Sequence, residues 1–133
     1  MKLNILIATV KDRRTMFNAL LTEFQRQIFE AELGRDVSVL YLEDNKEISV
    51  GLKRQRLLEM ATADYIVYFD SDDFPATDYV KQIIAAIETK PDCVGFKIAM
   101  TTNGNNPQTC CHSLKYKQWK NNFDGFDYVR NVT

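Results

Sequence analysis

Unbroken runs of apolar residues alternate with stretches of helical periodicity along the first hundred residues. Residues 3–10, 37–42, 65–69 and 93–100 are each rich in aliphatic, β-branched or aromatic side chains. Short runs of this kind are typical of strands that are buried on both faces of a parallel sheet. The pattern therefore predicts four strands, and residues 65–69 are the run expected to be buried on both faces.

Between these runs, apolar residues recur at the spacing of helices that pack one face on a sheet. The clearest period is Val80, Ile83, Ile84 and Ile87. Weaker ones are Phe17, Leu20, Leu21, Phe24 and Ile28, and then Leu57, Leu58 and Ala61. Parallel strands need crossover connections, so this alternation predicts an α/β fold with a Rossmann-like, mostly parallel sheet and helices on both faces.

The pattern changes after residue 100. Residues 101–109 are polar and are expected to form a loop, residues 112–119 alternate loosely like an edge strand, and residues 121–133 have no clear period. No internal repeat or interdomain linker is visible. We therefore expect a single domain, residues 1–133, in which residues 101–133 are an irregular tail.

Composition narrows the classes of function. Lys and Arg total 17 against 18 Asp and Glu, for a net charge of −1, which argues against a nucleic-acid partner. No apolar run reaches the length of a membrane span, and the N-terminus has no signal-peptide pattern. Three cysteines, two of them adjacent, are a poor disulfide framework and predict a reducing, cytoplasmic location.

Three carboxylates follow the third predicted strand within four residues, at Asp70, Asp72 and Asp73. Ligands of open α/β sheets bind beyond the carboxyl ends of the strands. Carboxylates this close repel one another unless water or a cation separates them, and their oxygens suit Mg²⁺ or Mn²⁺. The motif therefore predicts a metal-phosphate site at this edge of the sheet.

Other metal chemistry fits the sequence less well. An EF-hand loop beginning at Asp70 would place Pro75 where glycine is needed and Lys81 where glutamate is needed. Structural zinc lacks the paired-cysteine spacing it requires. His112 is the single histidine and stays open as a third metal ligand.

Charged loops follow the first and second predicted strands. Lys11-Asp12-Arg13-Arg14 follows the first, and Lys53-Arg54-Gln55-Arg56 follows the second. On the edge that carries the acids, Arg and Lys could neutralise a diphosphate, although such loops are more often only solvated. Asp44, at the end of the second strand, is either a nucleoside ligand or a turn aspartate.

In this order, the features resemble the family 2 glycosyltransferases of the GT-A fold. The similarity covers about residues 3–100 and rests on Ile5-Leu6-Ile7-Ala8-Thr9, Gly51, Lys53-Arg54-Gln55, Ala63-Asp64-Tyr65-Ile66 and the DXD-type motif Asp70-Ser71-Asp72-Asp73. The family has Ala-Arg-Asn where this chain has Lys53-Arg54-Gln55, which leaves the roles of Lys53 and Gln55 open.

The resemblance implies transfer of a sugar from a nucleotide-diphosphate-sugar donor to a hydroxyl acceptor, with inversion, and with Mn²⁺ or Mg²⁺ as the cofactor. It assigns nucleotide binding to Thr9, Arg13, Asp44, Arg54 and Asp70, and metal binding to Asp70 and Asp72. The sugar, base and acceptor stay open, as does a homo-oligomer that covers an exposed sheet edge.

Family members continue into an acceptor-binding half that supplies the catalytic base. Residues 101–133 are therefore an irregular tail or the start of that half, and we expect a fragment or an abbreviated form. The base stays unassigned. The alternative function is a nucleotide-sugar-binding module that lacks turnover. A haloacid-dehalogenase-type phosphatase is disfavoured, because its Asp-x-Asp motif usually follows the first strand.

Overall fold

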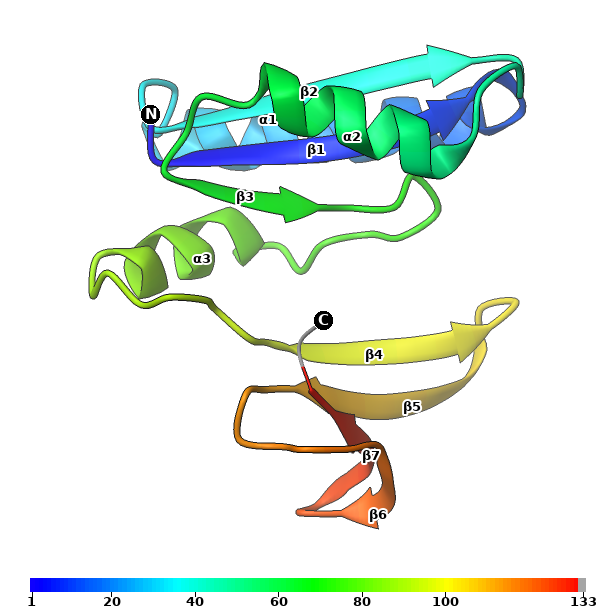
Figure 1. Ribbon diagram of the computed structural model, residues 1–133, viewed down its shortest axis with the longest axis vertical. Helices are drawn as coiled ribbons and strands as arrows, with labels where there is room; N and C mark the ends of the chain where they lie inside the picture. The colour runs from blue at the N-terminus through cyan, green and yellow to red at the C-terminus, as the bar shows by residue number, and fades with distance from the viewer. Residues whose placement is uncertain (132–133) are drawn as a thin grey trace. The chain divides into compact units, whose positions relative to one another are not determined.

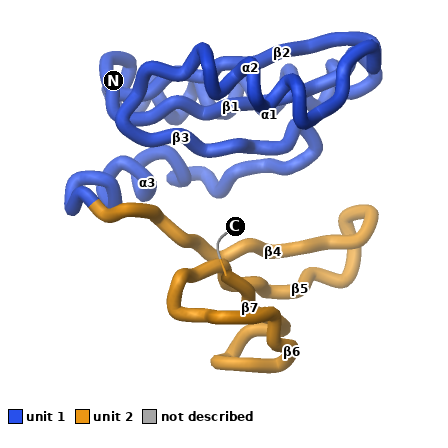
Figure 2. The backbone as a smooth tube through the Cα atoms, viewed as in Figure 1, with its two compact units in different colours: residues 1–90 blue, residues 91–133 orange. Residues whose placement is uncertain are grey.

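The computed structural model describes residues 1–131 and contains two compact units (Figure 2). Unit 1 is Met1–Lys90, and unit 2 is Pro91–Thr133. Val132 and Thr133, at the end of the predicted tail, lie outside the described residues. That residues 1–133 act as a single domain stays a prediction.

Unit 1 is built on a parallel sheet of three strands in the order β2-β1-β3 (Figure 1). The strands are β1 (Leu3–Val10), β2 (Val37–Asp44) and β3 (Tyr65–Tyr68). Strand β1 pairs in parallel with both β2 and β3, with Leu3 in register with Val37 and Tyr65, so all three strands run in the same direction. Their carboxyl ends consequently share one edge of the sheet.

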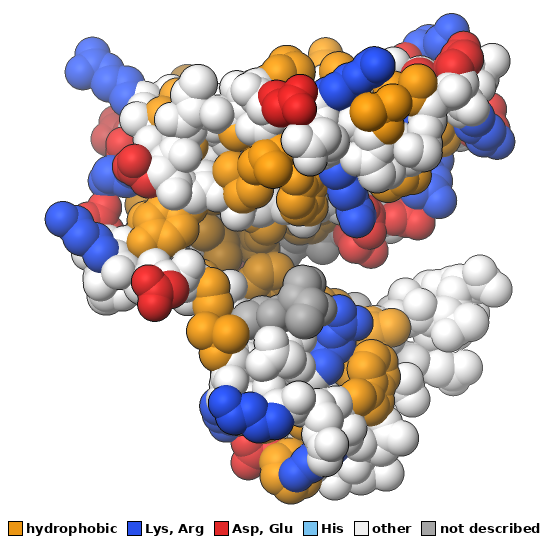
Figure 3. Space-filling view, viewed as in Figure 1, with side chains coloured by type: hydrophobic (Ala, Val, Ile, Leu, Met, Phe, Trp, Pro, Cys, Tyr) orange, Lys and Arg blue, Asp and Glu red, His pale blue; other side chains and the backbone are white. Residues whose placement is uncertain are grey.

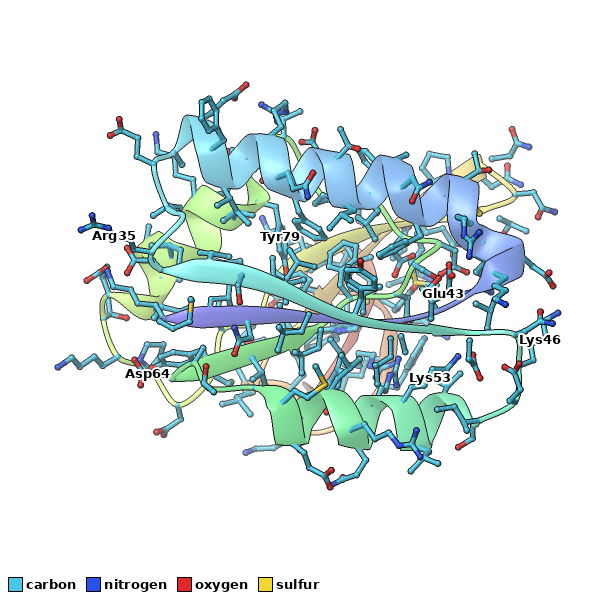
Figure 4. All side chains as sticks on the ribbon, turned by 90° about the horizontal axis from the view of Figure 1, so that it is seen from above. Arg35, Glu43, Lys46, Lys53, Asp64 and Tyr79 are labelled. Carbon is cyan, nitrogen blue, oxygen red and sulfur yellow. The ribbon has the colours of Figure 1, made fainter. Side chains whose placement is uncertain are left out.

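Helices cover both faces of this sheet. Helix α1 (Arg14–Glu30) follows the 3₁₀ turn η1 (Lys11–Arg13) and covers one face, while α2 (Val50–Met60) covers the other (Figure 4). Helix α3 (Tyr79–Ile87) packs with α1. The predicted α/β class, a parallel sheet between helices, is confirmed.

The core of unit 1 is centred on β1, which has a helix on each face. Leu3, Ile5, Leu6 and Ile7 are almost completely buried. The periodic residues of α3 are buried too, as the spacing predicts: Val80, Ile83, Ile84 and Ile87. An unbroken apolar run and a strict helical period each report burial directly, so these two elements match the sequence prediction.

Strand β3 is less buried than predicted. Ile66 and Tyr68 remain 38% and 39% exposed, so the expectation that residues 65–69 are buried on both faces is wrong. The reason is position: β3 is an edge strand, and α2 packs mainly on β1 and β2.

Unit 2 has a separate four-stranded sheet in the order β4-β5-β7-β6. Its strands are β4 (Lys97–Thr102), β5 (Asn105–His112), β6 (Lys120–Phe123) and β7 (Phe126–Arg130). The expected fourth strand of the parallel sheet, residues 93–100, is instead shifted to β4 and pairs antiparallel with β5. An edge strand over residues 112–119 and an irregular segment after residue 100 are also wrong for the described residues.

Two tight turns account for these differences. Asn103 and Gly104 have φ of 51° and 77° between β4 and β5, and Asp124 and Gly125 have φ of 59° and 80° between β6 and β7. Two-residue hairpin loops favour Asn-Gly and Asp-Gly because both positions adopt positive φ. Hairpins at these turns therefore pair β4 with β5 and β6 with β7, where a loop and an irregular segment were expected.

Two further predictions concern the cell rather than the fold. Cys93, Cys110 and Cys111 are unpaired in the structure. Among residues 1–131, no helix combines the length and the apolar character that crossing a bilayer requires. A cytoplasmic location stays a prediction.

Candidate functional site

The acidic turn follows β3 at the edge where the three parallel strands end. The Phe69 N–H donates to the Leu6 carbonyl, and the Asp73 N–H then donates to the Asp70 carbonyl at 3.1 Å, which folds the chain into a turn. Asp70, Asp72 and Asp73 each offer a carboxylate oxygen, and these oxygens lie within 4.8 Å of one another. Three exposed oxygen donors at this spacing fit Mg²⁺ or Mn²⁺.

The electrostatics of this turn are those of crowded like charges. Partial burial raises the pKa of Asp73 above its ordinary value, the negative charges of Asp72 and Asp70 raise it further, and Arg13 opposes the shift. Repulsion of this kind favours proton uptake or cation binding. The turn is therefore an oxygen-rich site that a divalent cation would stabilise.

Arg54 reaches the acidic turn from helix α2. Its Nη2 donates to Asp70 Oδ1 at 2.8 Å, and its guanidinium lies 5.5 Å from the centre of the Tyr68 ring. The Tyr68 hydroxyl donates to the Arg54 carbonyl at 3.2 Å. Because Tyr68 is the last residue of β3, its contacts with Arg54 link α2 to the strand that the acidic turn follows.

Arg13 reaches the same turn from η1, after β1. Its Nη2 lies 3.4 Å from Asp72 Oδ2. Both ion pairs, Arg13–Asp72 and Arg54–Asp70, are exposed, and exposed pairs contribute about 0–1 kcal/mol. Figure 3 shows acidic and basic side chains intermixed at the end of unit 1 where β1 and β2 end. These arginines can thus exchange their carboxylates for an anionic ligand at little cost.

Asp44 is the last residue of β2, and both of its carboxylate oxygens have partners. Oδ2 accepts from the Ile48 N–H at 2.8 Å, and Oδ1 accepts from Lys53 Nζ. These contacts, with Lys53 the larger cause, lower the pKa of Asp44 from 3.8 to about 2. Asp44 is therefore an ionised acceptor near neutral pH, and its side chain remains 14% exposed.

Lys53 is a buried residue at this edge of the sheet, and the sequence left its role open. Its side chain is 1% exposed, and its Nζ also donates to the Thr9 carbonyl at 2.8 Å. The buried positions of α2 are Lys53 and Leu57, whereas the predicted core position Leu58 is 42% exposed. The signal was the four-residue spacing of Lys53 and Leu57, which places them on one helix face.

Thr9 is the last residue but one of β1, and its hydroxyl is buried. The residue is 2% exposed, and its Oγ1 has no hydrogen-bond partner among the described residues. Ser71, inside the acidic turn, is likewise buried with an unpartnered Oγ. Lys53 connects Thr9 to Asp44, because its Nζ donates to the Thr9 carbonyl and to the Asp44 carboxylate.

The structure brings the predicted residues of unit 1 to one edge of its sheet. The predicted histidine belongs to unit 2. His112 ends β5 in unit 2, and burial lowers its pKa, with a smaller contribution from Arg130. In the part of the chain that the structure describes, the group of side chains able to hold a metal consists of Asp70, Asp72 and Asp73.

Comparison with known proteins places most of the chain in one family. The family model for glycosyl transferase family 2 matches residues 19–130. This stretch includes Asp44, Arg54 and the acidic turn, whereas Thr9 and Arg13 precede it. No curated protein and no solved structure matches the chain.

Proposed function

This chain belongs to glycosyl transferase family 2, and we propose that it transfers a sugar from a nucleotide-diphosphate sugar to a hydroxyl acceptor with inversion at the anomeric carbon. The observation that carries the proposal is the acidic turn. Its three carboxylate oxygens lie within 4.8 Å of one another, and Arg13 and Arg54 are paired with Asp72 and Asp70. Carboxylates with flanking arginines are the groups that bind a metal-diphosphate.

Each residue has a separate role in this proposal. Asp70 and Asp72 hold the cation, and Asp70 also meets the nucleotide. Arg13 and Arg54 turn from these carboxylates to the phosphate oxygens. Asp44 and the end of β1 at Thr9 meet the nucleoside.

Asp70 and Asp72 would hold a Mn²⁺ or Mg²⁺ ion, which when bound would supply positive charge to stabilise the leaving diphosphate. The arginines add positive charge at the same place and orient the diphosphate by directional hydrogen bonds. Inversion requires the acceptor hydroxyl to attack from the face opposite the diphosphate, with a base to take its proton. That base stays unassigned.

A second candidate is a module that binds the nucleotide sugar without turnover. Two acids of unit 2, Asp124 and Asp127, favour it, because the carboxylate of each already has a partner. Asp124 accepts from Lys115 and Tyr116, and hydrogen bonding from Lys115, then from Tyr116, lowers its pKa. Asp127 accepts from the Thr109 N–H at 2.7 Å. A carboxylate held in its ionised form by neighbours is a weak general base.

Calorimetric titration with UDP, GDP, CDP and ADP, each with and without Mn²⁺, tests the shared part of both candidates. We expect at least one nucleoside diphosphate to bind only with the metal. The corresponding nucleotide sugar then separates the candidates: release of free nucleoside diphosphate indicates turnover, and binding without release indicates the module. Absence of metal-dependent binding to every nucleotide would contradict both.

Asp72→Asn tests the metal assignment. The amide keeps the size of the side chain but removes a charged ligand, so Mn²⁺-dependent nucleotide binding should fall at least about tenfold, or 1.4 kcal/mol. Asp64→Asn is the matched control, because Asp64 is exposed at the opposite end of β3 (Figure 4). Unchanged affinity in Asp72→Asn with an unchanged thermal midpoint would remove the cation from this turn.

A further inference from the structure

Lys53 joins three elements beneath the proposed site. It belongs to α2, and its Nζ donates to the carbonyl of Thr9 in β1 and to the carboxylate of Asp44 in β2. Figure 4 shows the side chain between α2 and the strands. Two of its three N–H groups therefore have protein acceptors. The side chain is 1% exposed, so the ammonium is closed to solvent.

Packing alone does not account for a lysine at this position. Burying an ammonium costs several kcal/mol, and apolar replacement of a buried ion pair is often neutral or stabilising for the fold. Leu57, one turn further along the same face, fills its space without a charge. The charge of Lys53 is therefore expected to act on the groups it touches.

The group it touches at the surface is Asp44. Lys53 and the Ile48 N–H hold one carboxylate oxygen each, so the carboxylate plane is fixed from two sides. Asp44 is 14% exposed and Lys53 is 1% exposed, so a ligand can meet the carboxylate but not the ammonium. An ionised carboxylate only accepts hydrogen bonds, and its partner must be an N–H or O–H group, which a nucleoside has and a fully ionised, metal-bound diphosphate lacks.

We propose that Lys53 is a positioning residue of the nucleotide site, which fixes the Asp44 carboxylate and the end of β1 in the arrangement that receives the nucleoside. This inference rests on the proposed function. It assigns Lys53 to recognition of the nucleoside and not of the diphosphate, whose ligands come from the acidic turn and the arginines. Loss of Lys53 should therefore weaken the binding of a nucleoside diphosphate and leave the binding of pyrophosphate unchanged.

The test titrates wild type, Lys53→Met, Asp44→Asn and the double variant with Mn²⁺ and two probes. The probes are the nucleoside diphosphate that wild type binds best and inorganic pyrophosphate. Without Lys53 the Asp44 carboxylate loses the charged partner that fixes its orientation, so Lys53→Met should weaken nucleoside diphosphate binding about tenfold or more. Pyrophosphate binding should stay unchanged. The double variant should bind no more weakly than Asp44→Asn, because the two residues act as one unit.

Lys46→Met is the matched control. Lys46 follows the same strand, but its side chain is 66% exposed and pairs with Asp12. Its removal should leave the affinity for both probes unchanged. Thermal unfolding of each variant verifies the fold, and Lys53→Gln, which keeps an N–H donor without the charge, replaces Lys53→Met if that variant does not fold.

A measurement without ligand accompanies the titrations. The pKa of the Asp44 carboxyl, followed by NMR, should rise from about 2 towards 3.8 in Lys53→Met. An unchanged carboxyl titration overturns the inference, as do equal losses for both probes or additive losses in the double variant. If Lys53→Met binds the nucleoside diphosphate as tightly as wild type, the role of Lys53 is overturned and the proposed function is not. If wild type binds no nucleoside diphosphate, both are overturned.

Discussion

Individual ion pairs set the charge state of several carboxylates in unit 1. Hydrogen bonding from Arg26, and then from Gln27, lowers the pKa of Glu23 from 4.5 to about 2. Lys53 is the main cause of the similar lowering at Asp44. Asp73 differs in sign, because burial and two neighbouring carboxylates raise its pKa. Glu23 and Asp44 are thus held ionised by their partners, while the pKa of Asp73 in the acidic turn is raised by burial and by its neighbours.

The Glu23 pair makes stability depend on pH in a defined window. Because the folded pKa is lowered, the contribution of Glu23 is complete above pH 4.5, declines as the pH falls towards 2, and is lost below it. Glu23→Gln should lower the thermal midpoint at pH 6 and flatten its decline between pH 4.5 and 2. Thermal unfolding across this range measures both effects. Parallel curves for the two proteins would contradict the assignment.

Helices α1 and α3 are joined at the scale of elements by one buried amide. Gln27, on α1, is 4% exposed. Its Nε2 donates to the Ala76 carbonyl at 2.8 Å, and its Oε1 accepts from the Val80 N–H at 3.0 Å. A free N–H in the first turn of a helix needs such an acceptor. Gln27 therefore caps α3 from another helix, a role that Thr77 and Asp78 do not perform through a side-chain cap.

Gln27→Leu should destabilise the protein by about 2 kcal/mol, since it leaves the buried Val80 N–H without its acceptor and removes one of the two donors to the Ala76 carbonyl, which keeps the Tyr79 N–H. Gln25→Leu is the matched control: Gln25 is exposed two residues earlier on the same helix, and its change should stay within about 0.5 kcal/mol. Urea denaturation of both variants gives the comparison. Equal effects would show that the amide contributes nothing specific.

At the scale of the whole molecule, the candidate site belongs to unit 1. Thr9, Arg13, Asp44, Arg54 and the acidic turn all precede residue 90, and β1 gives this unit a core of its own. Unit 2 contributes a distinct antiparallel sheet. The proposed nucleotide and metal ligands therefore fall in one residue range, Met1–Lys90.

A chain that ends at Lys90 should fold and bind the same Mn²⁺-nucleoside diphosphate within about threefold of the full chain, or about 0.7 kcal/mol. The reason is that every proposed nucleotide and metal ligand is retained. Calorimetry, with thermal unfolding to establish the folded state, measures this. A folded but non-binding fragment would assign part of the nucleotide site to unit 2.

Some features of this protein followed from local sequence alone. Strand β1 and the buried face of α3 are strong periodic patterns, and burial is the property that such patterns report. Asn103-Gly104 and Asp124-Gly125 were readable hairpin signals as well, because positive φ at both positions is a local property of these residues. The candidate residues at the sheet edge followed from the alternation of strands and helices along the sequence, which places the ends of parallel strands at one edge.

What tertiary structure decided is which distant groups meet. Only the sheet order made β3 an edge strand, and only the packing of α2 buried Lys53 against a carbonyl 44 residues away. Periodicity reports which face of an element is covered, but a strand's neighbour and a buried charge's partner depend on free energies summed over contacts far apart in sequence. Sequence thus determined the main elements of unit 1 and the acidic turn, and the fold determined that Lys53 would hold Asp44 at the same edge of the sheet.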